Sequence, residues 1–328
     1  MVKVAFVGCG AIMEVHAKRL GRLPDVAMAG FCDTDLPRAE ASAATHGGAA
    51  FSDPAAMFDA VKPDAAYICV PPGARGPMEA EAARRGIHLF LEKPVALSRK
   101  TARAIGAAAR TGGILVSVGY CYRYLDTVQR ARKVLAGKPV TLVRGCWAGP
   151  MPRPAWWRRM DQSGGQVFDE TTHLFDMLRY LCGDIDEVHA VSSRGCMSAE
   201  GGHDIDDSSA LALRLKNGAA ATMASTCVLS QRLSPNGRPG VGIHELEIFT
   251  PDAILKLDPG HLTIIDNEKH TAFASRNDAF LEESRAFLEA VRSGKRTHIR
   301  SSLRDATKTL QVSCAAVESM KTGLPAKP

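Results

Sequence analysis

VKVAFVGCGAIM, residues 2–13, is an apolar run that ends in a Gly-x-Gly bend. Its pattern predicts a buried strand, a tight turn and a helix. Gly8 allows the turn, and Gly10 lets a pyrophosphate approach the backbone. A helix that opens near Ala11 and Ile12 points free N–H groups at the phosphates. The stretch therefore predicts a dinucleotide-binding turn at the start of the chain.

A second apolar run, residues 26–32, ends at Asp33, where the dinucleotide fingerprint places its ribose-binding acid. The combination of strand, bend, helix and distal acid favours a nucleotide site over an ordinary strand–helix turn. Met13 departs from the fingerprint, because a third glycine or an alanine normally stands there so that the helix can pack close to the strand. We expect its flexible thioether to fill the wider gap as part of the core.

Asp33 also predicts which dinucleotide is bound. Its carboxylate accepts hydrogen bonds from both ribose hydroxyls of NAD and repels the 2′-phosphate of NADP. Arg38 lies five residues further on and could pair with a 2′-phosphate, although it could equally be a solvated surface residue of the next helix. The sequence therefore favours NAD and keeps NADP as the second alternative.

The composition indicates a globular chain of 328 residues, long enough for two domains with separate cores. Lysine and arginine number 41 against 35 acidic residues, and this small excess is spread along the chain, which argues against a nucleic-acid partner. The nine cysteines form no CxxC pair, so we expect reduced residues in a cytoplasmic protein. We expect no membrane span and no targeting segment, since the first strand already uses the apolar N-terminal run.

Short apolar strands alternate with helical segments over the first third of the chain. This alternation is typical of a doubly wound parallel sheet, so we predict an α/β fold that begins with a Rossmann domain. Ligands bind such sheets at the carboxyl ends of the strands, which assigns Pro71, Pro72, Glu92 and Lys93 to the cofactor site as well. The predicted strands are residues 2–7, 26–32, 65–70, 87–91 and 114–118, and the predicted helices are 14–23, 36–46, 76–85 and 99–110.

After about residue 122 the pattern changes to consecutive strands. They are predicted at residues 187–193, 208–215, 219–228, 245–249, 254–257 and 261–265. Asn217-Gly218 is a strong hairpin signal, so the second sheet should be large, open and mostly antiparallel. Two closing helices, 278–292 and 301–320, complete an α+β domain. We therefore divide the chain into a Rossmann domain, 1–121, and a substrate-binding and oligomerisation domain, 122–328. A sheet with one uncovered face predicts a homodimer or homotetramer.

Four motifs occur along the chain in a characteristic order. They are GCGAI at residues 8–12, EKP at 92–94, VGY at 118–120 with Arg123, and Gly164-Gly165 followed by Asp169 and His173. In this ordered set the chain resembles the glucose-fructose oxidoreductase, inositol dehydrogenase and rhizopine-catabolism (Gfo/Idh/MocA) family. The resemblance covers nearly the whole chain. It implies a Rossmann domain that binds NAD or NADP, a second domain whose open sheet makes oligomer contacts, and sugar or cyclitol substrates.

The resemblance also implies a catalytic lysine. Lys93 follows a buried strand, and Pro94 prevents a helix from continuing beyond it, so the lysine can point into the crevice. In an arbitrary protein it would be a solvated lysine at a strand end. The matching lysine of the family contacts the reacting hydroxyl or carbonyl, which assigns Lys93 to catalysis and to substrate binding.

Asp169 and His173 match the family's acid–base pair. Together with Asp176 and Tyr180 they have i, i+4, i+7 and i+11 spacing, which predicts one polar face of a continuous helix. A solvent-facing helix is the ordinary alternative. The chain departs from the common version of this motif at residues 170–172, Glu-Thr-Thr, which leaves the identity of the substrate open.

Neighbouring aromatic and arginine side chains are expected to shape a substrate pocket. We assign such contacts to Tyr122, Arg123 and Trp157, since rings pack on the apolar faces of sugars and arginine donates to hydroxyls. Each ring could equally pack in the core or against another subunit. The cluster at residues 203–207 holds metal-ligand residue types, but no second ligand group recurs at metal spacing, so we predict no metal site.

The sequence thus predicts an NAD(P)-dependent dehydrogenase of a secondary alcohol in a sugar, cyclitol or sugar derivative. In the oxidative direction Lys93 and His173 would share the hydroxyl proton, and Asp169 would orient His173 or hold an adjacent hydroxyl. Two alternatives are a glycosidase or lyase-like enzyme that oxidises its substrate transiently with bound NAD, and a non-catalytic nucleotide-binding sensor. The three intact residues argue against the sensor, whereas nothing in the sequence excludes the glycosidase.

Overall fold

The computed structural model describes residues 1–196, 202–230 and 242–328, and the chain divides into two compact units. Unit 1 comprises Met1–Tyr124 and Asp278–Thr307, and unit 2 comprises Leu125–Asn277 and Lys308–Pro328. The first break lies close to the predicted boundary at residue 121. The chain then returns to unit 1 with helix α10 (Ala279–Ser293), which the sequence pattern places in the second domain.

Unit 1 is built on a six-stranded sheet in the order β3-β2-β1-β4-β5-β6, and all its neighbouring strands are parallel. This order confirms the predicted doubly wound α/β fold. The strands are β1 (Val2–Val7), β2 (Val26–Cys32), β3 (Ala49–Phe51), β4 (Ala65–Ile68), β5 (His88–Leu91) and β6 (Val116–Val118). The helices between them are α1 (Ala11–Leu20), α2 (Leu36–His46), α3 (Pro54–Val61), α4 (Pro77–Arg84) and α5 (Arg99–Thr111). The sequence pattern misses β3 and α3, because both are too short to show a clear apolar period.

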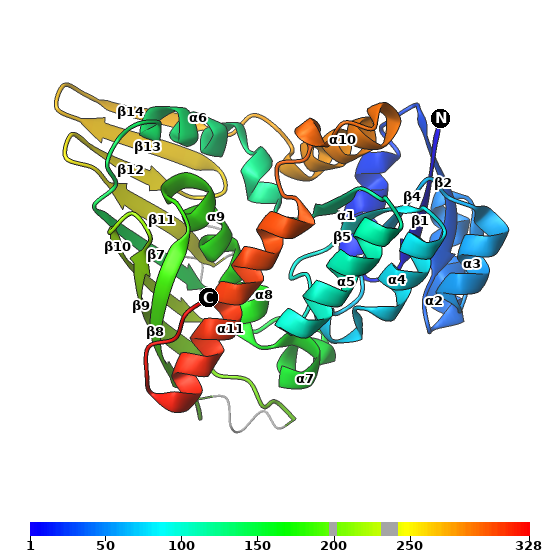
Figure 1. The fold of residues 1–328 in the computed structure, drawn as a ribbon, viewed down its shortest axis with the longest axis horizontal. Coiled ribbons are helices and arrows are strands. Elements are labelled where there is room, and N and C mark those ends of the chain that lie inside the picture. Colours follow the sequence, from blue (N-terminus) through cyan, green and yellow to red (C-terminus); the bar gives the residue numbers. More distant parts are fainter. Residues whose placement is uncertain (197–201, 231–241) are drawn as a thin grey trace. The chain divides into compact units, whose positions relative to one another are not determined.

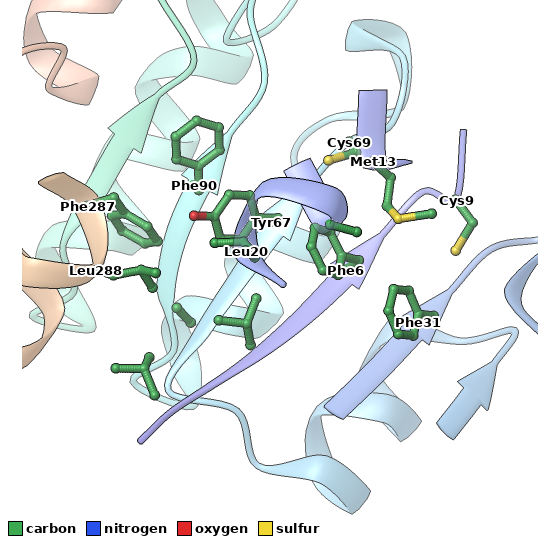
Figure 2. Close-up of a cluster of buried hydrophobic side chains, with 14 of the residues drawn as sticks. Phe6, Cys9, Met13, Leu20, Phe31, Tyr67, Cys69, Phe90, Phe287 and Leu288 are labelled. Carbon is green, nitrogen blue, oxygen red and sulfur yellow. The ribbon is translucent and has the colours of Figure 1, made fainter. Parts of the chain in front are cut away.

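The core of unit 1 explains why α10 belongs there. Phe287 and Leu288 of α10 are fully buried, and the Phe287 ring lies 5.8 Å from the ring of Tyr67 and 5.7 Å from that of Phe90 (Figure 2). Burying a side chain of this size stabilises a fold by about 1.5–3 kcal/mol. Met13 is 2% exposed in the same core, which confirms the prediction that it fills the gap between helix and sheet.

Unit 2 is built on an eight-stranded sheet in the order β14-β13-β12-β11-β7-β10-β9-β8, and only its β7–β10 pair is parallel. This confirms the predicted large, mostly antiparallel sheet. The strands are β7 (Leu142–Ala148), β8 (Ile185–Ser193), β9 (Ser208–Leu215), β10 (Ala220–Thr226), β11 (Ile243–Phe249), β12 (Ala253–Leu257), β13 (His261–Asp266) and β14 (His270–Ala274). Asn217-Gly218 joins β9 to β10, with Gly218 at a φ of +90°, as the hairpin signal predicts. The sequence pattern misses β7 and β14.

Helices α6 (Asp126–Leu135), α9 (Thr172–Cys182) and the C-terminal part of α11 (Leu303–Thr322) lie on the same side of this sheet (Figure 1). The strands alternate accordingly between buried and exposed residues, most regularly in β9 and β10. Among the helices in the described residues, none combines the length and the apolar character that a membrane span needs.

Candidate active site

The turn between β1 and α1 has the shape that the glycines predict. Gly8 has a φ of +91°, and a Cβ atom there would lie 2.8 Å from the carbonyl carbon and oxygen of Cys69. Glycine is therefore required at this position. At Gly10, which precedes α1, an added Cβ would meet nothing within 4 Å, and no side chain caps the helix. The open space and the first N–H groups of α1, near Ala11 and Ile12, fit the pyrophosphate of a dinucleotide.

Asp33 is held at the carboxyl end of β2 by the backbone around it. Its Oδ2 atom accepts the Cys9 N–H at 2.8 Å, and its Oδ1 atom accepts the Asp35 N–H at 3.0 Å. The guanidinium of Arg38 lies 3.8 Å from Asp33 Oδ2 and 3.4 Å from Asp35, with about half of its side chain exposed. The acid that the fingerprint needs is thus present and oriented beside the glycine turn.

Arg75, which is not among the predicted site residues, links the loops after β4 and β5 by hydrogen bonds. Pro71 and Pro72 follow β4, and Arg75 is buried just beyond them. Its guanidinium donates to the carbonyl of Val70 at 3.2 Å and to the carbonyl of Glu92 at 2.9 Å. An arginine in a loop gives no sequence signal of such a role, because only the tertiary structure brings the two loops together.

Lys93 directly follows a buried glutamate. The Glu92 Oε2 atom accepts the Lys93 backbone N–H at 3.1 Å, and its Oε1 atom lies 2.6 Å from His16 Nε2 on α1. Glu92 is a predicted cofactor residue, and in the structure both of its carboxylate oxygens have partners inside unit 1. His16 is fully buried and is not among the residues predicted from the sequence.

The predicted continuous helix through Asp169 and His173 is wrong. Asp169 is the last residue of α8 (Gln166–Asp169), and His173 lies in the first turn of α9, with the chain bent at residues 170–171. The adjacent threonines at 171 and 172 are β-branched and poor helix formers, which favours a break at this point. Both Asp169 and His173 are buried, at 7% and 8% exposure.

Asp176 and Tyr180 lie on α9 with His173, and their side chains bond to other helices. The Asp176 carboxylate accepts the hydroxyl of Thr309 on α11 at 2.9 Å. The Tyr180 hydroxyl accepts hydrogen bonds from Gln129 at 2.8 Å and from Arg132 at 3.1 Å, both on α6. These two side chains therefore connect helices within unit 2.

A tryptophan contacts each member of the expected acid–base pair. The indole Nε1–H of Trp157 donates to Asp169 Oδ2 at 2.7 Å, in a buried position. The Trp147 ring on β7 lies parallel to the His173 ring, with centroids 5.4 Å apart and an interplanar angle of 11°. Such contacts restrict the orientation of the carboxylate and of the imidazole, which is the condition for a positioned acid or base.

A second imidazole extends this arrangement. His244 on β11 is the cross-strand partner of Trp147, and the two rings stack with centroids 3.7 Å apart. Burial lowers the pKa of His244 to about 4, against a smaller opposite effect of Asp258. His244 is therefore neutral at neutral pH. Trp147 and His244 are not among the predicted site residues, because the sequence pattern does not predict β7 and cross-strand pairing is not visible in the sequence.

The remaining residues predicted to contact the substrate differ in burial and in their partners. The buried Arg123 guanidinium donates to the carbonyl of Arg300 at 2.7 Å and pairs with Asp305 at 2.5 Å, all within unit 1. The guanidinium of Arg123 thus has partners inside unit 1. Tyr122 is half-buried beside it, and Trp157 is almost fully buried against Asp169.

Comparison with known proteins gives family matches to most of the chain. A model of the family described as "Oxidoreductase family, NAD-binding Rossmann fold" matches residues 2–120, and a model described as "GFO/IDH/MocA C-terminal domain" matches residues 128–244. The scyllo-inositol 2-dehydrogenase (NAD(+)) of Bacillus subtilis (strain 168) is 30% identical over 342 residues, which cover 99% of this chain and 95% of that protein.

Solved structures share the fold along the whole chain. The levoglucosan dehydrogenase in complex with NADH and levoglucosan has a TM-score of 0.86 and 20% identity, covering 99% of this chain and 98% of that one. The WlbA dehydrogenase from Bordetella pertussis in complex with NADH and UDP-GlcNAcA has a TM-score of 0.84 and 19% identity, covering 100% and 98%.

Proposed function

The chain belongs to the Gfo/Idh/MocA family of NAD-binding oxidoreductases, and we propose that it oxidises a secondary alcohol of a sugar or cyclitol with Lys93, Asp169 and His173 as its catalytic residues. The main support for this proposal is the arrangement of Asp169 and His173. Both are buried, and each is oriented by a tryptophan although the helix between them is broken. We assign unit 1 to the cofactor and unit 2 to substrate binding and oligomerisation.

NAD supplies the hydride acceptor in this reaction when it is bound. The glycine turn with Gly8, Gly10, Ala11 and Ile12 would hold its pyrophosphate, and Asp33 its ribose. Pro71 and Pro72 belong to the same edge of the sheet, so we assign them to the cofactor as well.

Lys93 and His173 serve the proton side of the reaction. The Lys93 side chain contacts the reacting hydroxyl, and its amine shares the hydroxyl proton with the His173 imidazole as that proton leaves or returns. Asp169, bonded to Trp157, holds an adjacent hydroxyl or orients His173. The substrate class follows the relatives, which include an inositol dehydrogenase and a levoglucosan dehydrogenase.

A substrate panel tests this proposal. The purified protein is given NAD⁺ with scyllo-inositol, myo-inositol, levoglucosan or a methyl glucoside, and the nicotinamide absorbance is followed while products are identified by mass spectrometry. We expect NADH to form together with a ketone product on at least one cyclitol or sugar. Bond cleavage without net NADH would instead indicate the transient-oxidation enzyme, and no turnover on any polyol would favour the sensor.

We expect Asp33→Ser to change cofactor preference. The substitution removes a charged acceptor that would bind the ribose hydroxyls, a contact of about 1.5–3 kcal/mol, so NAD⁺ affinity should fall about tenfold or more. NADP⁺ affinity should change less or improve. Dissociation constants for both dinucleotides give the result, with Asp35→Ser as the control two residues away. An unchanged ratio of the two affinities would remove Asp33 from the ribose site.

We also infer that the chain forms a homo-oligomer through the open face of the unit 2 sheet. Two rows of residues cross this face, and short side chains form their centre. The rows are Val191, Ala210, Ala224, Cys146 and Glu245, and His189, Ala212, Thr222, Arg144 and Glu247. They line a shallow depression of about 740 Å³, and charges of both signs lie along one side. Such a surface can pair with a second copy of itself, as a two-fold interface requires.

Ala212→Glu should therefore shift the protein toward the monomer. A carboxylate in the centre of the depression would be buried against the partner without a compensating charge. Sedimentation velocity at micromolar concentration measures the change, and Ala107→Glu at an exposed position of α5 is the control. A wild-type protein that sediments as a stable monomer would refute the oligomer.

We further infer that the protein works in a reducing compartment, the cytoplasm. All nine cysteines are free in the structure, and six of them are buried. Free thiols in this number are typical of reducing environments.

A further inference from the structure

Three titratable side chains meet inside unit 1, next to the backbone of Lys93. They are His16 of α1, Glu92 after β5 and Glu283 of α10, and their nitrogen and oxygen atoms lie within 4.8 Å of one another. His16 and Glu283 are 0% exposed and Glu92 is 5% exposed. Neither the cofactor nor the catalytic roles proposed above use His16 or Glu283.

Glu92 connects this cluster to the catalytic lysine. One of its oxygens lies 2.6 Å from His16 Nε2, and the other accepts the Lys93 backbone N–H at 3.1 Å. Within the described residues, neither oxygen of Glu283 has a hydrogen-bond partner. A buried carboxylate without partners is costly, since it has lost its hydration and gained nothing in exchange.

The two glutamates therefore differ in charge. Burial raises the pKa of Glu283 well above its ordinary value, and the Glu92 carboxylate adds to this effect, whereas Arg19 opposes it. Burial also acts to raise the pKa of Glu92, but the hydrogen bond with His16 and the charges of His16, Lys93 and Arg75 outweigh it, so that its pKa is lowered. The groups that face Glu283 are His16 and Arg19 on α1, Glu92 after β5, Tyr67 on β4, Cys121 and Tyr124 in the short helix η2 (Cys121–Tyr124), and Asp278 before α10.

We propose that His16, Glu92 and Glu283 form a positioning unit for Lys93, in which Glu92 is the carboxylate and Glu283 is the neutral acid. His16 holds the Glu92 carboxylate from one side, and that carboxylate holds the Lys93 backbone on the other. Because Glu283 stays neutral, Glu92 is the one of these two glutamates that carries a negative charge next to Lys93. A second charge would favour the ammonium form of Lys93 and oppose its action as a base. The proposal rests on the catalytic role of Lys93 proposed above.

Infrared spectroscopy tests the protonation of Glu283 without any substrate. We expect the wild-type protein at neutral pH to show the C=O band of a buried carboxylic acid, and Glu283→Gln to lose that band. Glu282→Gln, next to it on α10 and partly exposed, is the control and should keep the band. The absence of such a band in the wild type would overturn the proposal, and so would a stoichiometric metal ion in the purified protein.

Thermal unfolding gives a second readout with a defined sign. A carboxyl whose pKa is raised in the folded state contributes its full stabilisation below its unfolded pKa, and loses it as the pH rises toward the folded value. The melting temperature of Glu283→Gln should therefore increase relative to the wild type as the pH rises above about 4.5. A difference that is constant with pH would contradict a neutral Glu283.

Kinetics of Glu92 variants test the link to Lys93. Removing the negative charge with Glu92→Gln should lower kcat about tenfold or more, as a displaced catalytic group does, with little change in KM for NAD⁺. The pH profile of kcat should move to lower pH by about one unit. Glu92→Asp keeps the charge and should keep the position of the profile, and it serves if the glutamine variant does not fold. An unmoved profile in Glu92→Gln would refute the link.

Lys93→Met distinguishes a failure of the catalytic role of Lys93 from a failure of the cluster. If Lys93→Met retained normal turnover, the catalytic role of Lys93 would fail, while the infrared and thermal results would still report on the cluster. If Lys93→Met were inactive and the infrared band were missing, the cluster would fail alone.

Discussion

Lys93→Met should lower turnover about 10²-fold or more on the true substrate, the range expected for loss of a positioned general acid or base. Methionine keeps most of the side-chain bulk but has no amine to share the proton of the reacting hydroxyl. The Lys93 backbone N–H that bonds to Glu92 is retained, so the loop should keep its conformation. Single-turnover kinetics, which separate chemistry from product release, give the measurement.

NAD⁺ affinity is the internal control for this variant. If Lys93 acts on the chemical step, the dissociation constant should change by about threefold or less while kcat falls. Lys100→Met on the exposed surface of α5 removes one ammonium group elsewhere in unit 1 and should affect neither quantity. A collapse of NAD⁺ binding in Lys93→Met would indicate a role in holding the cofactor and would contradict the proposed mechanism.

His173→Asn should have an effect of similar size, about 10²-fold or more in kcat. Asparagine is smaller and polar but cannot accept and return a proton near neutral pH. The variant also loses the parallel ring contact with Trp147, so its tryptophan fluorescence should change together with its activity. Turnover and NAD⁺ affinity are measured as for Lys93.

His270→Asn is the matched control for His173. His270 lies exposed on β14 in the same unit, and its replacement should leave turnover unchanged. If His173→Asn kept near-normal turnover, His173 would not carry the proton. Loss of the folded state, seen as a lower melting temperature, would instead indicate that the buried ring is needed for packing.

Much of the fold can be predicted from local sequence patterns. The bounds of β1, β2 and α2 agree with the prediction residue for residue, because long apolar runs and helical periods are properties of adjacent residues. The Asn217-Gly218 hairpin likewise follows from local turn chemistry. Short elements are unevenly predicted, because three to five residues carry little pattern: β6 and β12 overlap predicted strands, whereas β3 and β14 do not.

The candidate site could be predicted only in its chemically distinctive residues. Gly8, Asp33 and Lys93 stand in short motifs whose spacing along the chain has a physical meaning. Helical spacing failed for Asp169 and His173, because the chain bends after Asp169, at the Glu-Thr-Thr segment whose two threonines are buried. Asp176 has the right spacing, but its partner on α11 is 133 residues away in the chain.

The sequence by itself determined the alternation of strands and helices typical of a Rossmann domain, the glycine turn with Asp33, and the family to which the chain belongs. Each of these depends on adjacent residues or on motifs read in order. Only the tertiary structure decided that α10 joins unit 1 and that the Trp147 ring stacks with the rings of His173 and His244. It also decided that His16 and Glu283 cluster with Glu92, next to Lys93. The physical reason is that burial and charge depend on neighbours in space, and these groups come from strands and helices far apart along the chain.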